Sequence, residues 1–562
     1  MGNKSLHSVL ATNLAVGASA VTLFILTGSV TDPVNATKLL ILGGLAISSL
    51  ALVIQGLISG QVMRSWLDLL VILFVAWGLI AIVKSDSPMS QNYFGVYGRN
   101  TGWLAYFFFA LIFLSATKVR GRNNFKSAVI GFSIAAAVNV IYNSWVIAFG
   151  DFIGWQNIYG SVLGTFGNPN FASSFLGIAF GVNLVLAIKV ERRYKPVCIL
   201  LIPVIAWQLM NSGSIQGNVV AVLGTWIVGF FWVRERLLKT WISSAYLSSG
   251  VVVAITGVVG VFGSGPFRNL LAQPTIALRE QYWLAAVNMA RSNPLFGVGM
   301  DSYGDWYRRS RDAQALIVPG PETVTNAAHS VYLDLLAYGG VPLFVLYLVI
   351  LMTSLVSVLK VVKNSRSFDP VFVALTIIWI CYQVQAAISI NQIGLAIWGW
   401  LTSGLLIAYE RNLKNQKESK GQFSEEKRIA RKKPEILSPR LVSLVGLIVG
   451  LIMAAPPINA DMKWSDLQRT RDANLLTSAL AGTYMVPINS FRLAQAVELL
   501  ENSNLPDLSI QYARKGVEFN PNSFNAWQML YLSTNSTPEE KDKAKQEMVR
   551  LDPLNPSWKK LK

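Results

Sequence analysis

Apolar runs long enough to cross a bilayer recur along most of this chain of 562 residues. About thirteen can be counted, most of them roughly 17–25 residues long, which is the length that a transmembrane helix needs. Because a spanning segment must satisfy its backbone hydrogen bonds internally, we expect an all-α, polytopic membrane protein with about 13 transmembrane helices. The mean hydropathy of +0.44 agrees with this class. The expected spans are 8–29, 38–59, 66–83, 102–117, 127–149, 170–188, 196–211, 217–233, 241–262, 330–356, 370–389, 393–409 and 440–456.

The net charge of +18 gathers in the short connections between these runs. Basic residues fall in alternate connections, at 64, 118–126, 189–195, 234–239, 360–366 and 411–440. By the positive-inside rule, this alternation puts the amino terminus in the cytoplasm and everything after the last span outside. We therefore expect a multi-pass protein of a bacterial inner (plasma) membrane, with the lipid bilayer and no nucleic acid as its partner.

The spans and charges divide the chain into five parts. The expected parts are amino-terminal spans at 1–90, a membrane catalytic domain at 91–410, a basic cytoplasmic linker at 411–439, a last span at 440–456 and an extracytoplasmic tail at 457–562. The membrane domain includes a long outer loop, 263–329, which is then extracytoplasmic. The linker is expected near anionic lipid headgroups.

The tail contains two segments with similar sequences, which are called the repeated phrase below. FNPNSFNAWQML (519–530) and LDPLNPSWKKL (551–561) begin about 32 residues apart. This resembles tetratricopeptide repeats, whose period is about 34 residues, so we expect a helical-repeat domain, with a plain helical bundle as the alternative. A repeat array offers a groove for a peptide or another subunit, which makes a protein partner a hypothesis for the tail.

Few residues can supply metal-ion or imidazole chemistry. The chain has two cysteines, Cys198 and Cys381, and two histidines, His7 and His329. They are too few for a Cys/His zinc cluster, and no Walker A sequence is present, so we predict neither a metal nor another cofactor. His329 lies where the outer loop meets the next span, and it is the leading candidate for a catalytic group.

Five stretches with outer-face positions carry a resemblance to a known family. They are YFGVYGRNTGWLAY (93–106), GTFGNPNFASSFLG (164–177), NSGSIQGNVVAVLG (211–224), LREQYWLAAVNMARSNPLFGVG (278–299) and AAHSVYLDLLAYGGVP (327–342). Together they resemble the O-antigen ligase family, which includes lipid A core ligases, protein O-oligosaccharyltransferases and related polymerases. The resemblance runs from about residue 90 to 409, and PLFGVG and H-S-x-Y-L-x-x-L-A-Y-G-G are its most specific phrases.

The resemblance implies glycan transfer at the outer face of the membrane. The implied donor is a glycan on polyprenyl diphosphate, and the implied acceptor is a hydroxyl on a glycan, a lipid or a protein. The implied reaction is metal-independent and inverting. Ligase, polymerase and protein glycosylation activities stay open as alternatives at this point.

Arginine is the residue type that suits a departing diphosphate, because its planar fork bonds two oxygens at once. Arg279 matches a functional arginine of the family, and Arg99 is the second candidate. Arg279 opens a run in which Ile276, Trp283, Val287 and Ala290 share one face, so we expect a helix lying on the membrane surface. The alternative for Arg279 is an ordinary interfacial arginine.

His329 has two open roles in this chemistry. A neutral imidazole takes a proton from the acceptor hydroxyl, and a protonated one holds the diphosphate. Asp334 follows about a turn and a half later, and a carboxylate inside a span is costly enough to be a functional candidate that orients a neighbour.

Polar residues near other outer ends are further substrate-binding candidates. Gln216 stands where many lipid A core ligases have arginine, which looks closer to the protein O-oligosaccharyltransferase branch. Asn168 and Asn170 either cap the next span or touch the glycan. Asn391 and Gln392 match the family at a short outer turn and are expected to face the donor.

The other polar and aromatic residues of the outer loop have simpler expectations. Solvated charge is expected at Arg291, Arg308, Arg309 and Arg311. Tyr282, Trp283, Trp306 and Tyr307 are expected in a membrane-interface belt, with stacking on sugar as the alternative. A transporter or flippase of lipid-linked glycan, or a non-catalytic envelope scaffold, is the alternative to an enzyme. Polar residues at the outer ends of the spans, rather than at mid-membrane, favour the enzyme.

Overall fold

The fold of the chain is entirely helical wherever the structure describes it. The computed structural model describes residues 5–155, 157–237, 239–261, 265–266, 274–421 and 437–558. Within these ranges every regular element is a helix, apart from an isolated bridge between Thr483 and Val486. The predicted all-α class is confirmed.

Each of the thirteen apolar runs corresponds to one helix. The helices are α1 (Leu6–Leu23), α2 (Asn35–Ile58), α3 (Trp66–Lys84), α5 (Trp103–Ala116), α6 (Arg122–Phe149), α7 (Pro169–Lys189), α8 (Lys195–Met210), α9 (Ile215–Arg236), α10 (Thr240–Val261), α14 (Val331–Asn364), α15 (Pro370–Ala387), α16 (Ile393–Gly421) and α17 (Pro439–Ala454). Among the described residues, nine helices are long and apolar enough to cross a membrane, and α17 with the helix after it makes a tenth. The apolar parts of α5, α8 and α10 are shorter. The chain is therefore a polytopic membrane protein.

Small residues let neighbouring spans approach closely. A Cβ atom on Gly450 of α17 would lie 2.1 Å from the carbonyl oxygen of Gly43 in α2. Glycine at such a contact removes the side chain that would separate two helix backbones. The sides of α3 and α10 that face away from the bundle carry exposed apolar residues, as lipid-facing surfaces do.

The basic linker begins later than the sequence indicated. α16 continues to Gly421, so the first part of the expected 411–439 linker extends this helix. The expected lipid-headgroup contacts of 422–436 fall outside the described residues.

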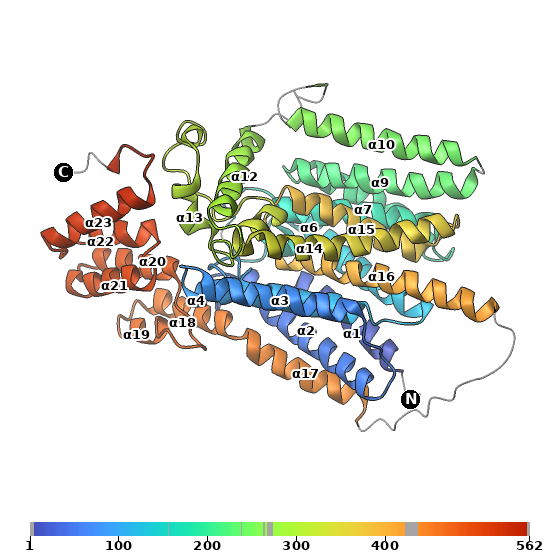
Figure 1. Cartoon of the computed structure of the whole chain (residues 1–562), viewed down its shortest axis with the longest axis horizontal. Helices are drawn as coiled ribbons and strands as arrows, with labels where there is room; N and C mark the ends of the chain where they lie inside the picture. Colours follow the sequence, from blue (N-terminus) through green and yellow to red (C-terminus); the bar gives the residue numbers. More distant parts are fainter. Residues whose placement is uncertain are drawn as a thin grey trace.

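Three helices that lie in the connections between the spans gather at one end of the bundle, together with the tail (Figure 1). They are α4 (Met89–Phe94), α12 (Pro274–Ser292) and α13 (Tyr303–Ser310). The predicted surface helix is α12, but its most buried face differs from the predicted one. Tyr282, Ala285 and Met289 are buried, whereas Trp283 and Val287 are only half-buried, because α12 packs against α14 and α13.

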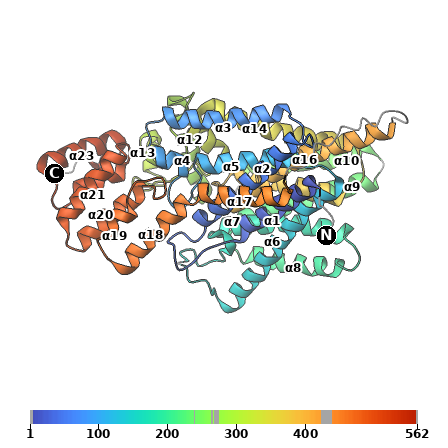
Figure 2. The ribbon, with the colours of Figure 1, turned by 90° about the horizontal axis from the view of Figure 1, so that it is seen from below.

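The tail is a helical domain with its own apolar core. Its helices are α18 (Pro456–Thr470), α19 (Leu475–Ala479), α20 (Ser490–Asn502), α21 (Pro506–Phe519), α22 (Phe524–Leu532) and α23 (Pro538–Leu551). α18 leaves α17 at an angle of 50° and leads into the tail (Figure 2). α20 packs on α21 and α22 on α23, and both copies of the repeated phrase begin where the second helix of a pair ends. The likeness to tetratricopeptide repeats stays a prediction.

Candidate active site

Two glycine-rich phrases meet at a break in α14. Gly339 and Gly340 leave the helical conformation, and Gly340 has a φ of 69°. The segment 294–299 lies against this break. The amide of Val341 donates to the carbonyl of Pro294 (2.8 Å), and the amide of Val298 donates to that of Ala337 (2.8 Å). A Cβ atom on Gly340 would lie 2.5 Å from the carbonyl oxygen of Pro294, so this contact requires glycine.

The contact brings Asp301 to Arg99, which comes from the connection between α4 and α5. A guanidinium nitrogen of Arg99 lies 3.2 Å from Oδ1 of Asp301, which is fully buried. The same nitrogen donates to the Tyr338 hydroxyl (3.1 Å), and this hydroxyl donates to Asp301 Oδ1 (3.1 Å). Arg99 also donates to the backbone carbonyl of Asn326. Burial disfavours the charge of Arg99, but Asp301, Tyr338 and Asp334 together outweigh it, and the pKa of Arg99 is raised.

His329 lies next to this ion pair and is half-buried. Its ring stacks on that of Tyr282 in α12, with ring centroids 5.4 Å apart. Burial, and then the positive charges of Arg279 and Arg99, lower the pKa of His329 from 6.5 to about 4. The imidazole is therefore neutral at pH 7, and it is close enough to both arginines for their charges to affect its pKa.

Arg279 is a half-buried cation near His329 and Tyr282. Burial lowers its pKa, and the nearby Tyr282 opposes this shift. No acidic side chain within the described ranges pairs with its guanidinium. Arg99 is neutralised by Asp301, so Arg279 is the arginine of this site whose charge is left for an anion.

Asp334 holds the backbone that precedes His329. One of its carboxylate oxygens accepts a hydrogen bond from the amide of Ala328 (2.7 Å). The side chain is fully buried, and its second oxygen has no partner in the described part of the chain. The orienting role of Asp334 stays a prediction, and the loop that carries His329 is the neighbour it contacts.

The backbone of the site is strained at three places. Five non-glycine residues with positive φ are described, and three of them are Asn100, Asp301 and His329, with φ angles of 52°, 55° and 56°. Non-glycine residues rarely adopt this left-handed conformation, and such strain concentrates at functional sites. Each of the three adjoins or belongs to the group around Arg99.

The remaining candidates lie in two other groups. Asn168 caps α7 by accepting from the amide of Asn170 (2.9 Å), and Asn170 accepts from the hydroxyl of Ser214 (2.8 Å), two residues before the buried Gln216. At the turn before α16, Gln392 accepts from the amide of Leu395 (3.0 Å).

Both side-chain polar atoms of Asn391, also at this turn, are buried, and the side chain lies close to the buried hydroxyl of Tyr106. No hydrogen bond or ion pair that the structure describes joins either group to Arg99 or His329. The predicted donor contacts of these residues stay predictions.

Sequence reasoning missed Asp301 and Tyr338 and gave Tyr282 a role at the membrane interface. Asp301 follows the PLFGVG phrase by two positions, and Tyr338 lies inside the second phrase, so their proximity to these motifs was the available signal. Tyr282 is buried and stacks on His329 instead of anchoring in headgroups.

A comparison with protein families gives one match. Residues 170–348 match the family model described as O-Antigen ligase. This part of the chain is therefore similar to the O-antigen ligase family. The matched segment runs from the start of α7 into α14 and holds Arg279, Asp301 and His329, whereas Arg99 lies before it. None of the curated proteins compared with the chain matches it.

This match supports a function of the membrane glycosyltransferase type. It implies a lipid-linked glycan and a membrane setting. Within the described ranges, no three His, Cys, Asp or Glu residues gather as they would around a metal ion. Metal independence stays a prediction for this protein.

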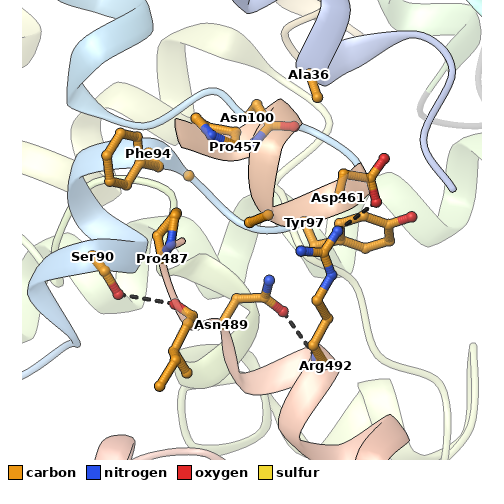
Figure 3. Close-up of a pocket in the computed structure, with 13 residues that line it drawn as sticks. Ala36, Ser90, Phe94, Tyr97, Asn100, Pro457, Asp461, Pro487, Asn489 and Arg492 are labelled. Atoms are coloured by element: carbon orange, nitrogen blue, oxygen red, sulfur yellow. Dashed lines mark hydrogen bonds and ion pairs between the residues drawn. The ribbon is translucent and has the colours of Figure 1, made fainter. Parts of the chain in front are cut away.

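A small cavity lies on the other side of the Arg99 connection, at the contact with the tail (Figure 3). Asn100, Tyr97, Asp461 and Arg492 are among the residues that line it. Its volume of about 20 Å³ is room for a water molecule rather than a sugar. The cavity is therefore not a candidate substrate site.

Proposed function

We propose that this protein transfers a glycan from polyprenyl diphosphate to an acceptor hydroxyl on the extracytoplasmic face. The observation that carries the proposal is the proximity of a neutral imidazole, His329, to Arg279, an arginine that pairs with no carboxylate in the described part of the chain. The reaction needs a base for the acceptor hydroxyl and a cation for the departing diphosphate.

In the proposed step, the acceptor oxygen attacks the anomeric carbon of the donor glycan and its proton passes to His329. The bond between that carbon and the diphosphate oxygen breaks, and the leaving polyprenyl diphosphate keeps the electron pair. Arg279 neutralises the charge that develops on the leaving group. The low pKa of His329 supports the role of base over that of a cationic phosphate ligand.

Arg99 has a different part in this proposal. Its charge is balanced by Asp301, and its other bonds go to Tyr338 and to the backbone of Asn326, three residues before His329. We assign Arg99 the positioning of the His329 loop, and the field that helps to keep the imidazole neutral.

The test uses the whole chain in proteoliposomes, with polyprenyl-diphosphate glycan and a panel of glycan, lipid and protein acceptors. We expect Arg279→Ala and His329→Ala each to lower kcat by about 10²–10⁴-fold, because each removes a group that acts in the transition state. Arg291→Ala is the matched control, since Arg291 is an exposed arginine of the same helix, and its kcat should stay unchanged.

EDTA forms a second arm of this experiment, and transfer should survive it. Equal losses in Arg279→Ala and Arg291→Ala would show that the Arg279 assignment is wrong. Passage of lipid-linked glycan across the bilayer without any transfer would replace the enzyme with a transporter.

A further inference from the structure

Helix α13 of the outer loop connects the tail to His329, because its two faces contact different parts of the molecule. On one face, Tyr303 and Tyr307 are fully buried. The Tyr303 hydroxyl donates to the backbone carbonyl of Tyr282 (2.6 Å), and the Tyr307 ring packs edge-on against the Tyr282 ring, with centroids 5.8 Å apart. Because Tyr282 stacks on His329, this face of α13 supports the imidazole through Tyr282.

The opposite face of α13 carries an acid and two arginines that the tail binds. Asn520 donates an amide hydrogen bond to Asp305 (2.9 Å), and Arg309 donates to the side-chain oxygen of Asn522 (3.2 Å). Arg308 donates to Asp552 (2.9 Å) and lies over the ring of Phe524, with its guanidinium carbon 4.3 Å from the ring centroid.

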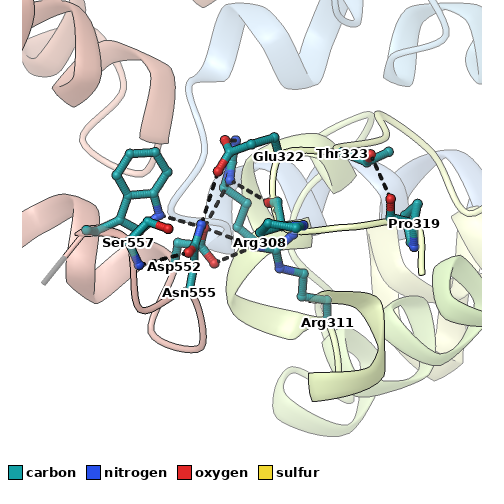
Figure 4. Close-up of polar contacts among 10 residues, drawn as sticks. Arg308, Arg311, Pro319, Glu322, Thr323, Asp552, Asn555 and Ser557 are labelled. Carbon is teal, nitrogen blue, oxygen red and sulfur yellow. Dashed lines mark hydrogen bonds and ion pairs between the residues drawn. The ribbon is translucent and has the colours of Figure 1, made fainter. Parts of the chain in front are cut away.

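Arg311, directly after α13, makes the most buried of these contacts. It donates two hydrogen bonds to the carboxylate of Asp552 (2.7 and 2.9 Å), and both side chains are fully buried (Figure 4). The indole of Trp558 donates a further hydrogen bond to Asp552 (2.9 Å). The expectation that Arg308 and Arg311 are solvated loop charges is therefore wrong, because the tail supplies a buried carboxylate to both.

The same arginines also hold the segment that leads to His329. Arg311 and Arg308 both donate to the backbone carbonyl of Pro321 (2.8 and 3.3 Å). The chain then continues to Asn326, whose carbonyl accepts from Arg99, and on to His329. The contact with Asp552 therefore restrains the His329 loop in two ways, through α13 and through the segment 321–329.

The tail residues that bind α13 occupy equivalent places in its repeated phrase. Asn520 directly follows the end of α21, and Asp552 directly follows the end of α23. Each of the two turns thus presents a short polar side chain at its first position, and both side chains bind the α13 segment. The repeated phrase that predicted a partner-binding domain is used here to bind a segment of its own chain.

We propose that the tail is a positioning domain for the active site, in which Asp552 and Asn520 fix α13 and thereby hold His329 against Tyr282 and near Arg279. The proposal rests on the proposed function for its kinetic part only. Neither residue reaches the site itself: Asn520 acts through α13, and Asp552 acts through α13 and the segment 321–329.

The first experiment needs no transfer activity and uses the full chain in proteoliposomes. Diethyl pyrocarbonate carbethoxylates neutral imidazoles, and the chain has only His7 and His329 to distinguish by mass spectrometry. The pH midpoint of His329 modification should lie near 4 in the original protein. In Asp552→Asn it should rise toward the ordinary value of about 6.5, because the released imidazole leaves its buried place between two cations.

Two further variants separate positioning from general damage. Asn520→Ala removes the contact with Asp305 without leaving buried arginines unpaired, and it should raise the midpoint in the same direction by a smaller amount. Arg514→Ala breaks an exposed ion pair with Glu540 inside the tail and should leave the midpoint unchanged. An unchanged midpoint in both Asp552→Asn and Asn520→Ala would overturn the proposal.

The kinetic readout is the division between kcat and KM. A displaced base should lower kcat about 10–100-fold in Asp552→Asn, with a far smaller change in KM for the donor. A rise in KM alone would overturn the positioning role. If the original protein transfers no glycan, the proposed function fails, whereas the shift in the His329 midpoint still tests the connection between tail and site.

Discussion

At the scale of single residues, the charge state of His329 decides which chemistry the site can perform. An imidazole with a pKa of about 4 carries no charge at pH 7, so it can accept a proton but cannot bind a diphosphate as a cation. Arg279 then has to supply the positive charge. The two residues therefore have complementary roles, and each affects the other, because Arg279 helps to lower the pKa of His329.

This coupling predicts a characteristic dependence on pH. For the original protein, kcat/KM should be level from pH 8 down to about 5 and should fall as the pH drops through about 4, where His329 gains its proton. Arg279→Gln removes one of the cations that lower this pKa, so its remaining activity should be lost at a higher pH. Steady-state rates from pH 3.5 to 8 measure both limbs.

Arg291→Gln, on the exposed side of the same helix, serves as the control for these rates. An acidic limb near pH 6.5 in the original protein would contradict the buried, neutral imidazole. Coincident limbs in the original protein and Arg279→Gln would contradict the coupling.

At the scale of elements, the break in α14 builds the site. Gly340 has φ 69° and ψ −172°, a conformation that is essentially restricted to glycine. It lets the backbone of 294–299 lie against the helix, which brings Asp301 to Tyr338 and Arg99. A continuous helix would leave the two phrases apart.

Gly340→Ala should therefore destabilise the protein and the site together. The strained conformation alone costs about 1–3 kcal/mol, and the added Cβ atom would also meet the carbonyl of Pro294. The matched control is Gly257→Ala in α10, where a Cβ atom meets nothing within 4 Å. We expect a lower thermal midpoint and slower transfer for Gly340→Ala, and an equal or higher midpoint for Gly257→Ala. Equal midpoints in the two variants would refute the role of the break.

At the scale of the whole molecule, the tail is attached to the membrane domain at a second place besides α13. Asp461 of α18 accepts from the amides of Thr31 and Asp32 in the connection between α1 and α2 (3.0 and 2.8 Å) and pairs with Arg492 of α20. Asp461 and Arg492 are buried. The tail, the α1–α2 connection and the Arg99 connection thus form one assembly at the same end of the bundle (Figure 1).

Arg492→Leu should weaken this attachment strongly, because it leaves the Asp461 carboxylate buried without its cation, at a cost of about 3–5 kcal/mol. Hydrogen exchange over α18 and α20 should accelerate accordingly. Arg469→Leu breaks an exposed pair with Asp466 on the same helix α18 and should change the opening free energy by no more than about 1 kcal/mol. Similar exchange in the two variants would mean that the buried pair does not hold the tail.

The sequence by itself determined the parts of this protein that depend on local composition. Every predicted span corresponds to a helix, because a run of apolar residues of sufficient length is a local property. The glycine phrases and His329 were recognisable for the same reason, since each lies in a short stretch typical of the family. The tail was also expected to be helical from its repeated phrase alone.

Only the tertiary structure decided which charges meet. Asp301 became the partner of Arg99, and Asp552 the partner of Arg308 and Arg311, across long separations in the sequence. Burial is what makes a carboxylate an obligatory partner of an arginine, and burial depends on how distant helices pack. The low pKa of His329 has the same origin, because burial and two arginines from different connections produce it together.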